Sequence, residues 1–226
     1  MIGVFDSGDG GLCTVERIRA ASPLIDVCFL ADKKNAPYGT KTRGEIISIT
    51  KKNIKILSDM GAEKVLIACC TASSVYTALT ESEKRIAVPI IDATARDAVK
   101  KTKSGKIGVI ATRATVLSGA FEKSVRQVLP SAEVFSEEAQ DLVTIIENGV
   151  NDKNISHRAR VAVEKILSGI KRHDFDVVIL GCTHFPRLEG TISEILGCET
   201  VSSASSGAAE ILSIADTRGS GRTVFL

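Results

Sequence analysis

The feature that most constrains the fold is an alternation of short apolar runs with amphipathic helical patterns along the whole chain. Most runs are continuous rather than alternating, which is typical of strands buried on both faces of a parallel sheet. Between them, apolar residues recur at helical spacing, as in Val163, Ile166, Leu167 and Ile170. The pattern predicts an α/β fold in which helices cover parallel strands. The predicted strands are residues 2–5, 27–30, 65–68, 88–91, 107–111, 133–135 and 177–180.

The chain also carries a weak internal repeat. Residues 106–112 echo residues 1–7, since both contain an Ile-Gly-Val triplet at the start of an apolar run. Residues 178–183 echo residues 65–71, and both of these runs end in a cysteine followed closely by threonine. The two echoes keep the same order at offsets close to half of the chain length. Together they predict two related α/β halves.

Composition excludes several classes of protein. The chain has 226 residues and is 44% hydrophobic, which is enough for one large domain or two small ones. Its 29 basic and 27 acidic residues leave a net charge of +2, and the basic residues are scattered, so we expect no nucleic-acid partner. No apolar run approaches the ~18–20 residues that span a bilayer, and the first residues lack the basic region of a signal peptide. The six cysteines form no Cys-x-x-Cys pair, so we expect reduced thiols in a cytoplasm.

Polar motifs follow four of the predicted strands, at the edge where parallel α/β sheets bind ligands. They are residues 6–11, 69–71, 112–115 and 182–184. If the two halves face each other, Cys69 and Cys182 approach one cleft from opposite sides. A helix N-terminus after each cysteine would lower the thiol pKa and offer N–H groups to an anion. For either cysteine alone, a small buried residue at the end of a strand is the alternative interpretation.

Two further side chains could assist these thiols. His184 lies two residues from Cys182, although a structural hydrogen bond is an equally simple role for a lone histidine. Asp6 ends an apolar strand, where a carboxylate is costly unless it is hydrogen-bonded or paired, and a turn or helix cap is the alternative. The glycine loop that follows fails the dinucleotide-binding pattern because its last position is Cys13.

Two thiols beside an anion site, without a nucleotide or pyridoxal motif, indicate a particular class of reaction. Inversion of a carbon next to a carboxylate requires a base on one face and an acid on the other. One cysteine would be thiolate and the other thiol, with the roles exchanged for the opposite enantiomer. The thiolate fraction would have to be raised from a free pKa of ~8.5.

Five ordered motifs resemble those of the glutamate racemases, in the cofactor-independent aspartate/glutamate racemase superfamily. The resemblance covers nearly all of the chain, and two of the motifs are centred on Cys69 and Cys182. The matching segments are residues 3–8 with 10–11, 36–39, 68–69 with 71–73, 107–112 and 181–186.

The resemblance implies two pseudo-symmetric, three-layer α/β domains with mainly parallel sheets and an active site in the cleft between them. Residues 1–93 and 206–226 would form the N-terminal domain, completed by the returning C-terminal segment, and residues 94–205 the second domain. It also implies a racemase without cofactor or metal that interconverts L-glutamate and D-glutamate. This enzyme would work as a homodimer in a bacterial cytoplasm and supply D-glutamate for peptidoglycan.

The same resemblance assigns roles to individual residues. Cys69 would abstract the α-proton of D-glutamate, and Cys182 would abstract that of L-glutamate. Asp6 would assist Cys69, while His184 and Glu147 would assist Cys182; for Glu147, an exposed acid at a helix end is the alternative interpretation. Substrate contacts would come from Asp6, Ser7, Tyr38, Gly39, Cys70, Thr71, Thr115, Thr183 and His184.

Three positions depart from the family pattern. The family usually has asparagine where this chain has Cys70 and threonine where it has Lys33, and it often has aspartate where this chain has Ser202. Both cysteines that would carry the chemistry are present. The departures therefore concern substrate affinity and substrate choice.

Three alternatives stay open from the sequence. The first is a sister enzyme on the same scaffold, such as a racemase of aspartate or another amino acid, a decarboxylase or an isomerase. The second is a zinc protein that uses Cys69, Cys70, Cys182 and His184, although their spacings are not the usual zinc clips. The third is a non-catalytic amino-acid binder, which the departures at Cys70 and Lys33 would explain.

Overall fold

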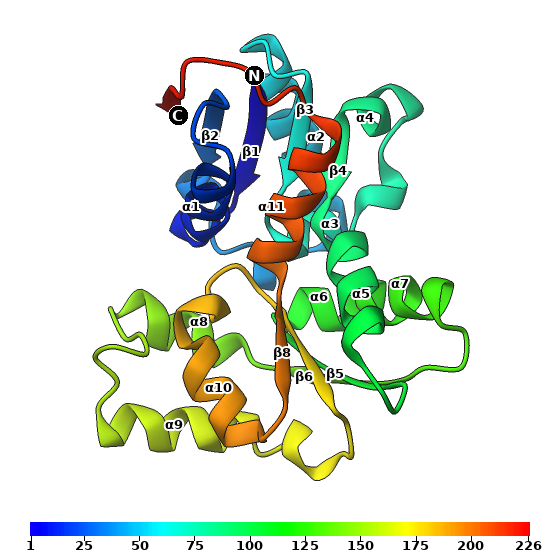
Figure 1. Ribbon diagram of the computed structural model, residues 1–226, viewed down its shortest axis with the longest axis vertical. Helices are drawn as coiled ribbons and strands as arrows, with labels where there is room; N and C mark the ends of the chain where they lie inside the picture. The colour runs from blue at the N-terminus through cyan, green and yellow to red at the C-terminus, as the bar shows by residue number, and fades with distance from the viewer.

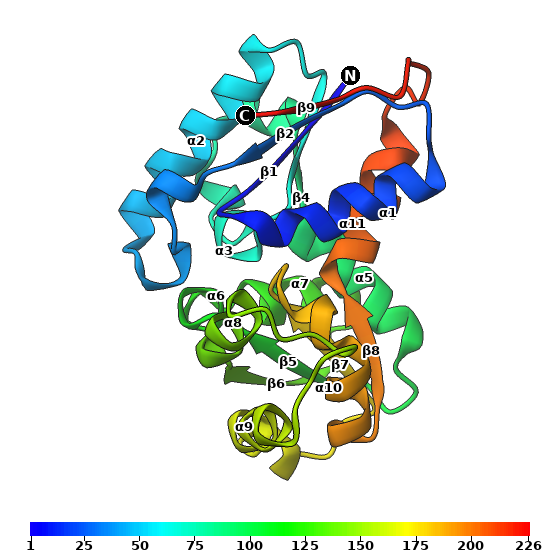
Figure 2. The same cartoon turned by 90° about the vertical axis from the view of Figure 1, so that its left-hand side faces the viewer.

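A computed structural model describes all 226 residues and contains two parallel sheets, one above the other (Figures 1 and 2). The first sheet has the strand order β4-β3-β1-β2-β9, and the second has the order β6-β5-β7-β8. We call the parts built on these sheets the first half and the second half. The strands are β1 (Ile2–Asp6), β2 (Val27–Ala31), β3 (Lys64–Ile67), β4 (Ala87–Pro89), β5 (Lys106–Ala111), β6 (Glu133–Glu138), β7 (Val177–Gly181), β8 (Glu199–Ser202) and β9 (Thr223–Phe225).

The strand order repeats between the two halves. In the first half the order β2-β1-β3-β4 is parallel throughout, and β6-β5-β7-β8 repeats it in the second. The segments that echo each other in the sequence lie on equivalent strands, β1 with β5 and β3 with β7. β9 has no counterpart, since it pairs with the outer edge of β2. The two α/β halves predicted from the sequence are confirmed at the level of topology.

Helices cover both faces of each sheet, which gives two three-layer halves. In β1, Ile2 and Val4 pack into one apolar cluster with α1 and α11, while Phe5 faces α2 on the other side. In β5, Ile107 faces α7, while Ile110 faces α8, α9 and α10. The longer helices are α1 (Leu12–Ala21), α2 (Arg43–Asp59), α5 (Ile90–Lys101), α7 (Ala120–Val128), α8 (Gln140–Glu147), α9 (His157–Leu167), α10 (Glu189–Leu196) and α11 (Ser203–Ile214).

The three shorter helices are α3 (Cys70–Ser73), α4 (Glu81–Ile86) and α6 (Arg113–Ser118). Local sequence sets where several of the helices begin. At α2 the Thr42 hydroxyl accepts a hydrogen bond from the Glu45 N–H at 3.4 Å, and the Glu45 carboxylate accepts one from the Thr42 N–H at 2.9 Å. This capping box satisfies two N–H groups that a helix start leaves free. No helix is both long enough and apolar enough to cross a membrane.

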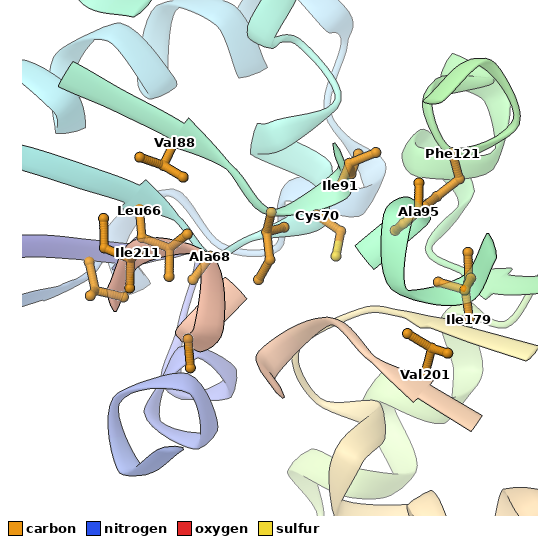
Figure 3. Close-up of a cluster of buried hydrophobic side chains, with 14 of the residues drawn as sticks. Leu66, Ala68, Cys70, Val88, Ile91, Ala95, Phe121, Ile179, Val201 and Ile211 are labelled. Carbon is orange, nitrogen blue, oxygen red and sulfur yellow. The ribbon is translucent and has the colours of Figure 1, made fainter. Parts of the chain in front are cut away.

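One apolar cluster of 26 buried residues runs through both halves. Figure 3 shows Leu66 and Val88 of the first sheet on one side of this seam, with Ile179 and Val201 of the second sheet on the other. Cys70 belongs to the same cluster and lies between them (Figure 3). The seam joins the two halves directly.

α5 and α11 carry the chain between the halves and pack against each other (Figure 1). The predicted boundaries, which assign residues 1–93 and 206–226 to one domain and residues 94–205 to the other, both fall inside these helices. The exact boundaries stay a prediction.

Two predicted strands have the wrong ends. The run predicted as strand 88–91 leaves the sheet at Pro89, because Ile90 and Ile91 already belong to α5. The strand predicted at 133–135 continues to Glu138. β6 is the edge strand of its sheet, so it carries polar residues that a search for buried runs does not detect.

Candidate active site

A small cavity lies between the halves, beyond the carboxyl ends of β1, β3, β5 and β7. Its volume is about 40 Å³, and 17 residues line it. Most of the residues predicted for the site meet here, six from the first half and four from the second. The predicted residues that line it are Ser7, Tyr38, Gly39, Cys69, Cys70, Thr71, Glu147, Cys182, Thr183 and His184.

Cys69 occupies the position between β3 and α3, where its backbone caps the short helix. Its side chain is buried, and the thiol donates a hydrogen bond to the Ser7 hydroxyl at 3.7 Å. Burial, followed by the charge of Asp6, raises the pKa of Cys69 to about 11. The N–H groups at the start of α3 lower this pKa, as expected, but the loss of solvation outweighs them and the net shift is upward.

Cys182 follows β7 and is also buried. Its Sγ lies 3.7 Å from His184 Nδ1, so the imidazole is within reach of the thiol proton. Burial raises the pKa of Cys182, and the backbone N–H of His184 opposes this effect in part. The close packing at this position depends on Gly181, because a Cβ there would approach the Ile110 carbonyl oxygen to 2.9 Å.

His184 joins the thiol to a carboxylate at the cavity rim. Its Nε2 lies 3.3 Å from Glu147 Oε1. The Glu147 side chain is 61% exposed at the end of α8, whereas the His184 side chain is only 10% exposed. Glu147, His184 and Cys182 thus form a line from solvent to the buried thiol.

Asp6 lies behind the cavity lining rather than in it. It is fully buried, accepting a hydrogen bond from the Gly8 N–H at 3.0 Å and another from the Thr183 hydroxyl at 3.0 Å. Burial raises the pKa of Asp6, while His184 and these two hydrogen bonds lower it again in part. The bond to Thr183 ties the first half to the second beside both cysteines.

The glycine loop after β1 packs directly against the second half. A Cβ at Gly10 would lie 2.6 Å from Thr183 Oγ1 and 2.8 Å from His184 Nδ1. Only glycine therefore fits where this loop meets the segment that holds Cys182 and His184. The loop is a packing surface for the opposite motif.

Tyr38 and Thr115 are held by other protein groups. The Tyr38 hydroxyl donates to Asp32 Oδ2 at 2.6 Å and accepts from Asn53 Nδ2 at 3.0 Å, so only its ring is free to line the cavity. Thr115 lies behind the lining, where its hydroxyl is 2.9 Å from that of Thr112 and 3.2 Å from that of Thr71. This threonine cluster joins α3 to α6 across the cleft.

Thr112, Gln140 and Val143 line the cavity although no site role was predicted for them. The position of Thr112 could have been predicted from the sequence, since this residue belongs to a motif at the end of a predicted strand. Gln140 was missed because the preceding strand was predicted to end too early, which hid its position just beyond the carboxyl end of β6.

The cysteines form neither a disulfide nor a metal-binding cluster. All six cysteines are unpaired. No group of three or more His, Cys, Asp or Glu side chains is arranged to hold a metal ion.

Comparison with known proteins places this geometry in a family. Residues 15–211 match the Asp/Glu/Hydantoin racemase family. A glutamate racemase of Aquifex aeolicus is 34% identical over 97% of this chain and 85% of its own length. A glutamate racemase of Desulforudis audaxviator is 35% identical over 88% of this chain and 72% of its own.

Solved structures agree with the sequence relatives. A glutamate racemase isoform from Bacillus anthracis superposes with a TM-score of 0.91 at 31% identity, covering 100% of this chain and 86% of that one. A glutamate racemase from Francisella tularensis, solved in complex with D-glutamate, superposes with a TM-score of 0.87 at 28% identity, covering 99% and 86%. The chain therefore belongs to the Asp/Glu/hydantoin racemase family, and the four relatives named above are glutamate racemases.

Proposed function

We propose that this protein racemises glutamate without a cofactor, by moving the α-proton between the substrate and two thiols, Cys69 and Cys182. The observation that carries the proposal is that both thiols line one cavity, from equivalent strand ends in opposite halves. The glutamate racemases among its relatives support the choice of substrate, as does the related structure that holds D-glutamate.

The reaction proceeds by one proton abstraction and one proton donation. With D-glutamate, the Cys69 thiolate takes the α-proton, so the C–H bond breaks and its electron pair stays on the α-carbon. The Cys182 thiol gives its proton to the opposite face, which forms L-glutamate and leaves a Cys182 thiolate. L-glutamate reacts in the reverse sense. A proton shift between the two thiols restores the starting state.

The thiol that acts as the base must first lose its proton, since burial favours the neutral form of both thiols. His184 is placed to accept the proton of Cys182, and Glu147 stabilises the imidazolium that results. We assign the corresponding role for Cys69 to Asp6. Its negative charge raises the pKa of that thiol, so Asp6 assists by taking up the thiol proton and not by its charge. The two halves thus use different groups for the same task.

Substrate must enter from the side of Glu147. The cavity between the thiols has room for about three water molecules, less than glutamate needs, so its walls must part on binding. A neighbouring cavity of about 420 Å³ shares Gly8, Glu147 and His184 with it. Lys33 and Arg187 line this outer cavity together with Asp9 and Glu147. Lys33 is paired with Asp9 at 2.9 Å, which leaves Arg187 as the cation that can meet an acidic substrate.

We further propose that the product D-glutamate serves peptidoglycan synthesis in a bacterial cytoplasm, and that the protein acts as a homodimer. The bacterial relatives support the first part. Sedimentation velocity of the purified protein tests the second, since a monomer at micromolar concentration would contradict it.

Proton NMR in D₂O tests the reaction. Purified, reduced protein is incubated without added cofactor with L-glutamate, D-glutamate and both enantiomers of aspartate. We expect the α-proton signal of glutamate to disappear while the opposite enantiomer forms. Exchange confined to aspartate would keep the mechanism and change the substrate. No exchange with any of the four would contradict the proposed function.

A further inference from the structure

The cavity has no permanent cation to bind its substrate. None of its 17 lining residues is lysine or arginine. Under the proposed function, on which this inference rests, the substrate brings two carboxylates into that space. Buried carboxylates without a cation need neutral donors, namely hydroxyls, amides and backbone N–H groups.

Several of the hydroxyls around the cavity already bind other protein groups. Tyr38 donates to Asp32, and Thr183 donates to Asp6. Thr71 and Thr112 bond to each other at 2.9 Å and both bond to Thr115. These side chains can serve a ligand only by giving up a bond that now joins parts of the protein.

Gln140 supplies the only side-chain amide among the lining residues. It is the first residue of α8, just beyond the carboxyl end of β6 in the second half. Its Oε1 is buried without a hydrogen-bond partner. Unpartnered buried polar atoms are rare and unfavourable, and they are relieved when a ligand supplies the missing partner.

The amide of Gln140 reaches across the cleft to the first half. A Cβ at Gly39 would overlap Gln140 Oε1 and would also lie 3.1 Å from the Thr112 Cβ. Gly39 therefore leaves the space that the amide occupies. The last torsion of a glutamine side chain is broad, so the amide can turn its two Nε2–H donors toward a ligand without moving α8.

We propose that Gln140 is a substrate-binding residue whose Nε2 donates a hydrogen bond to a carboxylate of the amino acid. The bond forms only in the complex, once the amide has turned so that Nε2 takes the buried place where Oε1 now has no partner. It then supplies one of the neutral donors that the cavity needs. A bond from the α-ammonium group to Oε1 is the competing geometry. Replacement of Gln140 by glutamate distinguishes the two geometries, because its carboxylate would repel a substrate carboxylate and attract an α-ammonium group.

Two variants test the proposal, with Gln127→Leu as the matched control on the exposed outer side of α7. Gln140→Leu keeps the size of the side chain and removes the amide, so the KM for glutamate should rise about tenfold to a hundredfold while kcat changes little. Gln140→Glu places like charge beside a carboxylate and should raise KM further. A KM within twofold of wild type for Gln140→Leu overturns the proposal, as does a KM for Gln140→Glu below that of Gln140→Leu.

Stability provides a readout that a merely structural role would not give. Without substrate, Gln140→Leu should melt at or above the wild-type Tm, because the unpartnered amide is gone. Saturation with glutamate should then raise its Tm less than that of wild type at equal concentration. A lower Tm without substrate, together with an unchanged shift on glutamate addition, would mean that Gln140 is structural and would overturn the proposal.

Failure of the proposed function gives a different result. Titration calorimetry of wild type with D-glutamate measures binding without turnover. If wild type binds glutamate but does not racemise it, the proposed function fails, and the comparison with Gln140→Leu still tests Gln140 through Kd. If wild type does not bind glutamate, both proposals fall.

Discussion

The two cysteines occupy equivalent positions in the two halves and yet have different surroundings. Cys69 follows β3, which pairs with β1, and Cys182 follows β7, which pairs with β5. Both cysteines are buried and line the same cavity. Cys69 contacts the hydroxyl of Ser7 at 3.7 Å, whereas Cys182 contacts the imidazole of His184 at 3.7 Å. The repeated topology places two equivalent thiols, and the loops that differ between the halves determine how each is ionised.

The acids near the two thiols differ as well. Asp6 is fully buried and held by Gly8 and Thr183, while Glu147 is mostly exposed. A buried carboxyl group acts strongly on its neighbours because water does not screen it, and an exposed one acts weakly. The comparison therefore predicts equal importance for the two thiols and unequal importance for their assisting acids.

The largest effect should come from either thiol alone. Cys69→Ala and Cys182→Ala each remove the acid or base from one face, so each should lower racemisation in both directions by at least about a thousandfold. A coupled assay for each enantiomer measures this. Cys198→Ala, in the second half outside the cavity lining, is the control and should keep its activity. Full activity in either cavity variant would end the two-thiol mechanism.

The second-largest effect should distinguish the groups that assist the two thiols. Asp6→Asn should slow the step at Cys69, and His184→Asn the step at Cys182, each by about tenfold to a hundredfold in kcat. The enantiomers have equal free energies, so kcat/KM must fall equally in both directions. The difference appears in the deuterium isotope effect, which should grow with D-[2-²H]glutamate in Asp6→Asn and with the L-enantiomer in His184→Asn. The same pattern in both variants would contradict the division of roles.

The pKa of the thiols predicts a rise in activity with pH. Burial raises the pKa of Cys69 to about 11 and also raises that of Cys182, so at pH 7 little of either is thiolate. We expect kcat/KM and the iodoacetamide reaction of Cys69 to increase by up to about tenfold per pH unit between 7 and 9. Peptide mass spectrometry follows each cysteine separately. A flat alkylation rate over this range would show that another group already holds Cys69 in its thiolate form at pH 7.

The same shift affects stability in a defined direction. A thiol with a raised pKa binds its proton more tightly in the folded state than in the unfolded state. Its contribution is complete below the ordinary pKa of 9.0 and is lost as pH rises toward about 11. The free energy of unfolding should therefore decrease over this window, and less so in Cys69→Ala.

The outlines of the fold followed from the sequence because buried strands and their sequence pattern have the same cause. The five apolar residues 107–111 form β5, as a strand covered on both faces requires. Edge strands lack that pattern, which is why β6 was cut short and Gln140 overlooked. The strand prediction for residues 88–91 was wrong at its end for another reason. Continuous apolar residues fit the buried start of a helix as well as a strand.

Within the site, position was easier to predict than electrostatics. The residues after β3 and β7 had to lie at one edge of their sheets, so a meeting of Cys69 and Cys182 could be predicted from the repeat. The direction of their pKa shifts could not, because it depends on burial by segments distant in sequence. Asp6 was correctly seen as a carboxylate in need of partners, but its partner Thr183 became visible only in three dimensions.

A smaller effect should come from the exposed acid of the second half. Glu147→Gln removes the carboxylate that lies 3.3 Å from His184 at the cavity rim, where solvent screens its charge. We expect kcat to fall by about twofold to fivefold, far less than in His184→Asn. Salt should reduce the difference between wild type and this variant. A loss as large as that of His184→Asn would mean that Glu147 moves protons itself.

The smallest effect concerns the residue after each cavity cysteine, which is Thr183 in the second half and Cys70 in the first. Thr183 anchors Asp6, whereas Cys70 packs into the apolar seam near Ser203. The hydroxyl of Ser203 is buried without a partner, so an amide at position 70 would have a group to bond with. We therefore expect Cys70→Asn to fold and to retain or raise kcat/KM. Complete loss of activity, in a protein with an unchanged circular dichroism spectrum, would give the second thiol a role of its own and break the equivalence of the two halves.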